Sequence, residues 1–413
     1  MKDVGTVESA RAAFPRRLCV TLGLFVLLFT AVPASSQETG LRLGGLRLTP
    51  TVTISVESDS NVLNDDNPKQ DWTTASSLSL EARARVGIAG IRARSALDAM
   101  YYNTHTERRS VGGRQEVEAE FYLARLRPFM AQSYGNVRTP FSVEVDLPVR
   151  RLEMATTVGA DFKMTALTTI RGQVDRRENS FANDALYRGV ELAAPLNLVS
   201  EKAQVSLLHD LTPLTKLSVT GELQQDRFEF QPSRNGDSLR VSSGVTFQPY
   251  GLISGSANVG YRRFTFPDPL TPPFRGLVAS VDLSFRLLNA SRLNVRMGRD
   301  VPYSMSPDQP YFVSSLLGAS LAHDFRDNWE VEGEWRRDKM AYQHLSSIVG
   351  GIELSEALGT RTDYVHAYGA AVRRRFNRRL RLDVNFRTNA HESSDKQFAY
   401  SKFTMGSSVV YGF

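Results

Sequence analysis

Histidines are the residues best suited to acid–base or nucleophilic chemistry, and this 413-residue chain has six of them. A hydrolase would need a serine or an aspartate beside a histidine that a third group orients. His344 has Ser346 close by in the sequence, and His391 has Ser393 and Asp395. Both sets fall in predicted loops, where closeness along the chain is common, and no phosphate-binding glycine loop, nucleotide fingerprint or metal-ligand spacing accompanies them. We therefore expect no enzymatic activity, no cofactor and no metal site.

Charged side chains at alternate positions are the second set of residues that could act on a solute. If these rows face a water-filled interior, they create a transverse field that favours polar solutes. The planar guanidinium of arginine can also bind a carboxylate or a phosphate with two hydrogen bonds. The alternative is that the charges pair across neighbouring strands and only line a wet wall. The residues predicted to line such an interior are Arg83, Arg85, Arg92, Arg94, Glu116, Glu118, Glu120, Asp282, Arg286, Arg296, Glu330, Glu332, Glu334, Arg373, Arg375, Arg381, Asp383 and Arg387.

The segments that carry these residues have an apolar period of two from about residue 48 onward, instead of the helical period of about 3.6. Residues 380–387, for example, read Leu-Arg-Leu-Asp-Val-Asn-Phe-Arg. Each such segment predicts a β-strand with one apolar face and one charged face. A soluble sandwich would bury the apolar face, whereas a transmembrane barrel would turn it towards lipid.

The lengths of the predicted connections decide between these two architectures. Short and long connections alternate along the chain, as expected when every second turn faces the periplasm and every other loop faces the outside. We therefore predict an all-β, antiparallel, up-and-down transmembrane barrel over residues 48–413, with about 18 strands or alternatively 16, wide enough to leave an aqueous channel. The short connections are 87–90, 124–127, 162–164, 211–213, 248–250, 288–290, 326–328 and 377–378, and the long ones are 58–71, 105–114, 139–149, 178–200, 231–237, 267–272, 304–309, 345–361 and 392–397.

Residues 1–36 have the pattern of a cleaved signal peptide, with basic residues followed by an apolar core of 15 residues at 18–32 and then by small residues. We expect 37–47 to be a short periplasmic segment. The single cysteine, Cys19, would leave with the signal, so the exported chain could form no disulfide. The 50 basic and 44 acidic residues are evenly mixed, which argues against nucleic acid as a partner.

The last predicted strand has Val409, Tyr411 and Phe413 on one face, and Phe413 is the final residue. Such a strand resembles the signal by which bacterial outer-membrane proteins are handed to the barrel-assembly machinery. We therefore expect an outer-membrane location in a Gram-negative type of envelope, with membrane lipid and lipopolysaccharide as surroundings. Aromatic residues near the predicted strand ends could form two girdles at the level of the lipid headgroups. They are Tyr101, Tyr102, Phe228, Phe230, Tyr261, Phe264, Trp329, Tyr364 and Tyr411.

Residues 46–50 (Leu-Arg-Leu-Thr-Pro) and 57–62 (Glu-Ser-Asp-Ser-Asn-Val) resemble the opening of a family of putative beta-barrel porins linked with surface-polysaccharide export. Segments 211–215, 226–230 and 253–264 are similar to the same family. The resemblance runs from about residue 46 to the last residue. It implies an outer-membrane barrel and does not identify a solute.

Three functions remain open on this basis. The first is a porin-like channel for the passive passage of small polar solutes or saccharides. The second is an exopolysaccharide exporter that handles an anionic polysaccharide together with periplasmic export proteins. The third is a non-conducting structural or adhesive barrel. The loops 178–200 and 345–361 are unusually apolar, so either they narrow the channel or they rest on its rim.

Overall fold

The computed structural model describes residues 40–249, 251–288, 290–345, 348–349, 352–353 and 361–412. The predicted signal peptide, 1–36, and Phe413 lie outside these residues. Residues 40–413 form one compact unit.

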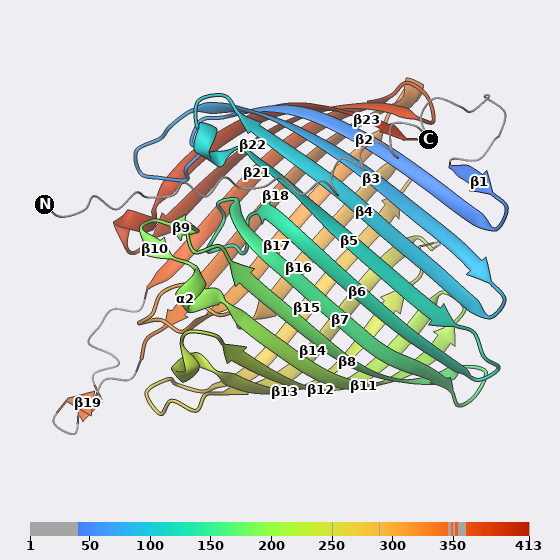
Figure 1. Cartoon of the computed structure of the whole chain (residues 1–413), viewed down its shortest axis with the longest axis horizontal. Coiled ribbons are helices and arrows are strands. Elements are labelled where there is room, and N and C mark those ends of the chain that lie inside the picture. Colours follow the sequence, from blue (N-terminus) through green and yellow to red (C-terminus); the bar gives the residue numbers. More distant parts are fainter. Residues whose placement is uncertain are drawn as a thin grey trace, which may run out of the picture. The chain divides into compact units, whose positions relative to one another are not determined.

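Eighteen antiparallel strands form the wall of a closed barrel (Figure 1). The first of them pairs with both the second and the last, which closes the ring. The predicted fold class and the predicted count of 18 strands are thus confirmed, and the alternative of 16 is not observed. The strands are β2 (Leu46–Asp59), β3 (Asp71–Val86), β4 (Ala89–Tyr102), β5 (Ser110–Phe121), β6 (Leu126–Thr139), β7 (Val149–Lys163), β8 (Thr168–Phe181), β11 (Leu198–Thr212), β12 (Thr215–Phe228), β13 (Gly236–Phe247), β14 (Ile253–Thr265), β15 (Phe274–Leu287), β16 (Ser291–Asp300), β17 (Tyr311–Asp324), β18 (Trp329–Gln343), β21 (Thr362–Arg375), β22 (Leu380–Ser393) and β23 (Tyr400–Gly412).

The alternation of side chains along each strand separates an apolar face from a polar face. Val205, Val219 and Leu277 are 62%, 54% and 63% exposed, whereas the neighbouring Ser206 is 4% exposed. Leaving large apolar side chains in water forgoes about 1.5–3 kcal/mol each, so a surface built from them is matched to lipid and not to water. The apolar face is therefore the outside of the barrel.

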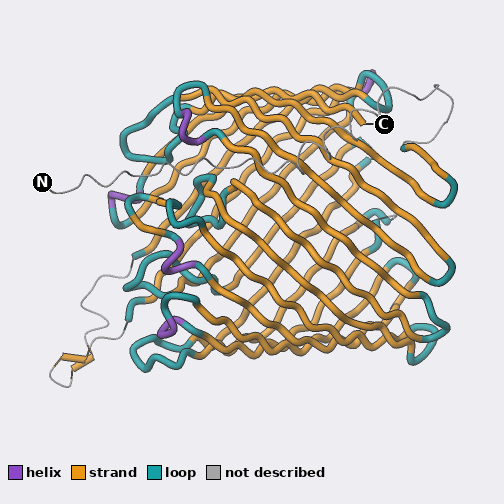
Figure 2. Tube along the Cα trace, in the orientation of Figure 1, coloured by secondary structure: helices purple, strands orange, loops and turns teal. Residues whose placement is uncertain are grey.

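The connections differ in length between the two ends of the barrel (Figure 2). At one end they span two to five residues, and at the other they span six to eighteen. The predicted alternation of short and long connections is confirmed. Short 3-10 turns and one helical turn occur in the connections: η1 (Thr106–Arg108), α2 (Ala193–Leu196), η2 (Pro232–Arg234), η3 (Arg326–Asn328) and η4 (Lys396–Phe398). None of the helices within the described ranges has the length and apolar character that a membrane-spanning helix needs.

Two different segments share one edge of β2. The short strand β1 (Leu41–Leu43) pairs with residues 46–48, and β23 pairs with residues 51–59. The turn between β1 and β2 contains Gly44 with φ of +61°, a left-handed conformation that favours glycine. From residue 41 onward the segment predicted to precede the barrel is therefore hydrogen-bonded to the sheet.

The expected aromatic girdles are only partly observed. Tyr101 and Tyr261 are each 51% exposed on the outside, but Tyr102, Phe228 and Phe264 are buried. Because successive strand residues point to opposite faces, Tyr101 and Tyr102 cannot both reach the headgroup layer. The assignment of Tyr102, Phe228 and Phe264 to a girdle was wrong: they lie on the inward face, beneath the long loops.

Candidate functional site

The inward face can be identified from a loop that reaches it from the far side of the ring. Val143, in the connection between β6 and β7, packs against a cluster formed by Phe312 of β17 and Met340 and Tyr342 of β18. A loop can contact the opposite wall only through the interior, so the even-numbered residues of β18 face inward. The pairing registers extend this assignment to every strand, and they place all the predicted lining residues on the inward face.

Carboxylates of β3 and β5 neutralise most of the predicted arginines on β3 and β4. Arg92 donates to Glu118 at 2.9 Å and Arg94 to Glu116 at 3.2 Å, and Arg83 pairs with Glu81 on its own strand. The remaining members are Glu120, which accepts a hydrogen bond from Tyr122 at 2.7 Å, and Arg85, which lies 4.9 Å from the centre of the Tyr122 ring.

A second group of ion pairs lies on β18, β21 and β22. Arg373 contacts both Glu330 and Glu332, the latter at 2.6 Å. Arg387 pairs with Glu334 at 2.6 Å. Within β22, Arg381 pairs with Asp383 at 3.1 Å. The Arg387–Glu334 pair is exposed and contributes only about 0–1 kcal/mol to stability, whereas Glu330 is largely buried beneath Arg373. All these pairs shape the field inside the barrel.

The remaining predicted residues are less tightly held. Asp282 and Arg296 approach to 3.5 Å, with both side chains more than 60% exposed. Arg286 lies opposite Arg292 in register, and Arg375 lies opposite Arg381. Within the described ranges neither Arg286 nor Arg375 has a carboxylate at ion-pair distance, so positive charge collects near the short-turn end of this wall.

The wall from β11 to β17 carries inward hydroxyl and amide groups that were not among the predicted lining residues, because only charged residues were predicted. Hydroxyl and amide side chains dominate its middle, and they hydrogen-bond in pairs: Ser206 with Thr220 at 2.8 Å, and Asn294 with Ser320 at 2.9 Å. The signal in the sequence is Ser, Thr or Asn at every second position, opposite apolar residues. The other inward members are Ser218, Ser242, Ser256, Asn258, Ser280 and Ser284.

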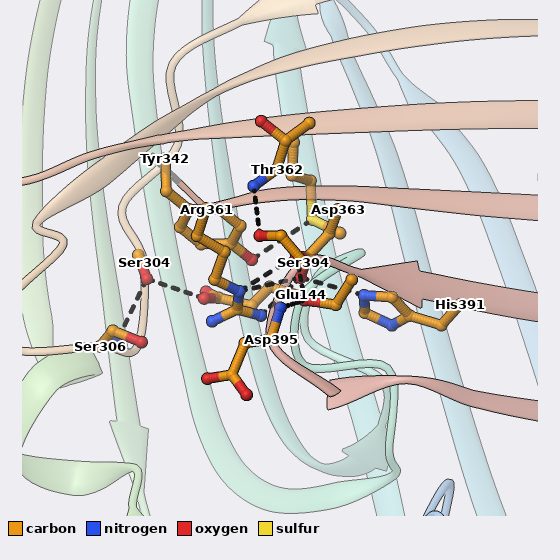
Figure 3. A network of polar contacts seen from close by, with 12 residues as sticks. Glu144, Ser304, Ser306, Tyr342, Arg361, Thr362, Asp363, His391, Ser394 and Asp395 are labelled. Carbon is orange, nitrogen blue, oxygen red and sulfur yellow. Dashed lines mark hydrogen bonds and ion pairs between the residues drawn. The ribbon is translucent and has the colours of Figure 1, made fainter. Parts of the chain in front are cut away.

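At the long-loop end, connections from opposite sides of the ring meet over the interior (Figure 3). The β6–β7 and β16–β17 connections are eight strands apart in one direction and ten in the other. The carboxylate of Glu144 nevertheless accepts a hydrogen bond from Ser304 Oγ at 2.7 Å and one from the backbone N–H of Met305 at 2.8 Å. All three residues are nearly fully buried. Loop contacts therefore cross the outer mouth of the barrel.

A second carboxylate of the β6–β7 connection forms hydrogen bonds to two further loops. Asp146 accepts hydrogen bonds from Asn64 at 2.9 Å and from the hydroxyl of Tyr187 at 3.0 Å. Asn64 belongs to the β2–β3 connection. Tyr187 belongs to a small hairpin of β9 (Leu186–Tyr187) and β10 (Val190–Glu191).

Burial sets the ionisation of both loop carboxylates. Loss of hydration is the largest influence on Glu144 and on Asp146, and it raises the pKa of each above its ordinary value, although the hydrogen bonds oppose this shift. The same effect lowers the pKa of Arg234 to about 10. Arg234 extends from the β12–β13 connection and donates to the backbone oxygens of Ser304 and Pro310, which fixes the β16–β17 loop from a third side.

An apolar cluster fills the space beneath these polar contacts. Leu192 and Leu196, from the loop predicted at 178–200, are 0% and 1% exposed and pack with Val145 and Met305. This apolar loop packs against other loops of the mouth, and that it narrows the channel stays a prediction. The other apolar loop, 345–361, lies largely outside the described residues, which show only a hairpin of β19 (Ile348–Val349) and β20 (Ile352–Glu353).

Among the described candidates, His391 and Ser393 are not arranged for nucleophilic attack. His391 Nε2 lies 3.1 Å from Asp363, and the hydroxyl of Ser393 donates to the same carboxylate. The serine thus contacts the acid and not the histidine, and His391 is only 3% exposed. His344 contacts the side chain of Gln309 at 3.2 Å. Ser346 lies outside the described residues.

The predicted assembly signal lies on the outside of the closing strand. Val409 pairs in register with Ile54, and Tyr411 with Val52, so both belong to the apolar outer face. Val409 and Ile54 are 43% and 52% exposed. Interaction with the assembly machinery stays a prediction.

Comparison with known proteins supports the same architecture. No curated protein matches the chain. Among solved structures, Pseudomonas aeruginosa OpdK with vanillate matches with a TM-score of 0.50 and 9% identity, over 89% of this chain and 98% of that one. A BenF-like porin from Pseudomonas fluorescens Pf-5 matches with a TM-score of 0.50 and 9% identity, over 89% and 99%. The family model described as "Putative beta-barrel porin 2" matches residues 34–412, so the chain belongs to this family of porin-like outer-membrane barrels.

Proposed function

We propose that the protein is a passive channel for small polar solutes, saccharides included, and that the loop network at the outer mouth limits its conductance. The hydroxyl- and amide-lined wall from β11 to β17 carries this proposal. Groups such as Ser206, Thr220 and Asn294 can exchange hydrogen bonds with water or with a neutral polyol without the cost of separating a fixed ion pair.

The pairing of the inward arginines with carboxylates argues against a strongly anionic solute. An uninterrupted basic track from Arg83 to Arg387 would suit an anionic polymer, but Arg92, Arg94, Arg373 and Arg387 each contact a carboxylate. Export of an anionic polysaccharide with periplasmic export proteins is therefore our less favoured proposal. In either case we propose that residues 1–36 direct export and are removed, and that the protein has no catalytic activity.

The crossing loops favour one alternative from another class. Because Glu144 and Ser304 join opposite sides of the mouth, a barrel whose loops never separate would conduct poorly and would serve a structural or adhesive role. The channel and the structural barrel differ in the conductance expected after the loop cluster is removed.

Single-channel conductance in a planar bilayer tests the proposal with three proteins. We expect a small steady conductance from the refolded barrel and a severalfold larger one after deletion of residues 182–196, because the deletion removes Leu192 and Leu196 from the mouth. Exposed Glu107, in another long loop, supplies the control Glu107→Gln, which should conduct like the wild type. Heat-modifiable migration in gels checks folding, and Leu192→Asp replaces the deletion if the deleted protein does not fold.

Equal conductance from the wild type and from a folded loop variant would refute the role given to the loops. Silence from both, as folded barrels, would refute the channel and leave the structural role. Current blocked by an anionic oligosaccharide and not by a neutral one would favour the export proposal instead.

A further inference from the structure

Five cationic side chains stand on the lipid-facing side of neighbouring strands. Cross-strand registers put Arg263 of β14 directly opposite Arg275 of β15, and Arg299 of β16 opposite Ala279. Arg337 and Lys339 of β18 share this outward face. All five side chains are exposed. We call them the outer basic patch.

The patch differs in its partners from the inward arginines beside it. Within the described ranges, no carboxylate lies at ion-pair distance from any of the five. Arg337 and Lys339 lie 5.0 and 5.8 Å from the ring of Tyr364, and Arg299 donates to the backbone oxygen of Leu277 at 3.1 Å. Inward arginines nearby are paired: Arg262, next to Arg263, contacts Asp300 at 2.7 Å. The patch is therefore a concentration of unbalanced positive charge.

The outward carboxylates on either side do not neutralise it. Asp237, on β13, forms an ion pair with Arg227 at 2.8 Å. Glu392, on β22, lies opposite Tyr364 in register and forms no ion pair within the described residues. These two residues mark the lateral edges of the patch.

Position along the strands places the patch at one boundary of the apolar band. Arg263 lies ten residues past Ile253 at the start of β14, and Lys339 lies ten past Trp329 at the start of β18. At about 3.3 Å per residue and a tilt near 40°, ten residues rise about 25 Å, which is the height of the lipid-facing apolar band. The cations thus reach the headgroup layer at the long-loop end, which is the outer leaflet.

The opposite side of the ring carries fewer outward cations at that level. Val56, Tyr101, Val111 and Tyr134 occupy outward positions eight to twelve residues from the short-turn ends of their strands, and all are exposed and uncharged. Arg138 of β6 is also outward in this range, but it is only partly exposed and donates to the backbone oxygen of Arg108 at 2.8 Å. Buried in hydrocarbon, an unpaired arginine would cost about 2–4 kcal/mol. A ligand at the headgroup level therefore offers the patch the counter-charge that the protein itself does not provide.

We propose that the outer basic patch binds the phosphate groups of a phosphorylated glycolipid of the outer leaflet, the lipid A part of lipopolysaccharide. Arginine forms bidentate hydrogen bonds to phosphate, which suits Arg263, Arg275 and Arg299. From β14 to β18 the patch spans four strand spacings, or roughly 19 Å. This breadth matches a headgroup with phosphates at both ends of a disaccharide better than the single phosphate of a glycerophospholipid. Beneath the patch, exposed Leu277 and Leu317 offer an apolar surface to the acyl chains.

The test measures lipid binding to the refolded full barrel in neutral detergent. Diphosphoryl lipid A, its dephosphorylated form and phosphatidylglycerol are titrated separately, and bound lipid is counted by native mass spectrometry. We expect diphosphoryl lipid A to bind about tenfold or more tightly than either of the others, and the triple variant Arg275→Gln/Arg299→Gln/Lys339→Gln to lose about tenfold or more of that affinity.

The double variant Arg176→Gln/Glu201→Gln is the matched control, since it removes an outward ion pair at a similar level on β8 and β11. It should bind lipid A within about twofold of the wild type. If the triple variant does not fold, Arg299→Gln alone should lower the affinity severalfold. Equal binding by the patch variants and the wild type, or equally tight binding of dephosphorylated lipid, would overturn the proposal. Phosphatidylglycerol binding as tightly as lipid A would overturn the choice of ligand.

Discussion

Replacing Glu144 with alanine should release the contact that joins opposite sides of the outer mouth. The carboxylate is the acceptor for two donors of the β16–β17 connection, the hydroxyl of Ser304 and the backbone N–H of Met305. Both donors are fully buried, so they have no water to replace the lost acceptor. The variant removes the acceptor and leaves the strands untouched.

The size of the effect follows from the cost of unsatisfied donors. Each buried donor left without a partner costs about 1–3 kcal/mol, which sums to about 2–6 kcal/mol for the two. Removal of a buried carboxylate offsets part of this cost, so we expect about 2–4 kcal/mol of lost closure free energy. At about 1.4 kcal/mol per factor of ten, the population of separated loops should rise roughly 30- to 700-fold.

Hydrogen exchange at the amide of Met305 reports the loss of this contact, because in the wild type that amide exchanges only when its bond to Glu144 opens. Glu144→Gln keeps one carbonyl acceptor, so its loss of protection should be smaller. Glu107→Ala, in an exposed position, should show none. Unchanged protection of Met305 in the folded Glu144→Ala barrel would refute the view that this carboxylate holds the mouth loops together.

Three further outcomes are expected. Burial raises the pKa of Glu144 and of Asp146, so protonation favours the closed mouth. Closure should be strongest below the ordinary glutamate value of 4.5 and should weaken as the pH rises through the raised value, which would be seen as conductance that increases with pH. Glu332→Gln should shift the reversal potential towards anion selectivity and Arg373→Gln towards cation selectivity, because the two charges face each other inside the barrel; shifts of the same sign would contradict this. Leu192→Ala should cost about 2–4 kcal/mol of loop stability, measured as faster exchange of loop amides, and an effect below about 1 kcal/mol would mean that the loop cluster collapses around the vacancy.

The strand count could be predicted because it depends on local signals. Alternation with a period of two marks each strand, and the lengths of the connections mark the two ends of the barrel. The face of each charged residue follows from the same alternation. For this reason Arg83 and Arg387, far apart in the sequence, were both placed on the polar face.

The loop network could not be predicted, because its partners are distant along the chain. Residues 143–147 read Val-Glu-Val-Asp-Leu, which alternates like a strand with two solvated acids. Both acids are instead in contact with other loops, and Glu144 meets Ser304 across 160 residues. The assignment of the buried aromatic residues to a girdle was wrong for the same reason. Phe264 looks like a girdle residue until the β16–β17 loop is known to cover it, with Tyr303 5.5 Å away.

The shared edge of β2 has a consequence for how the ring is sealed. Because β1 already occupies residues 46–48, β23 can add only from residue 51 upward, and a slide of β23 by two residues towards the short-turn end would collide with β1. A shift of β23 by one residue is unfavourable for another reason, because it would turn the apolar side chains of β23 inward. Together, the alternation of β23 and the presence of β1 leave few possible registers for the closing strand. The three residues of β1 therefore block a shift of β23 at the closing strand pair, where a wrong register would prevent the barrel from closing correctly.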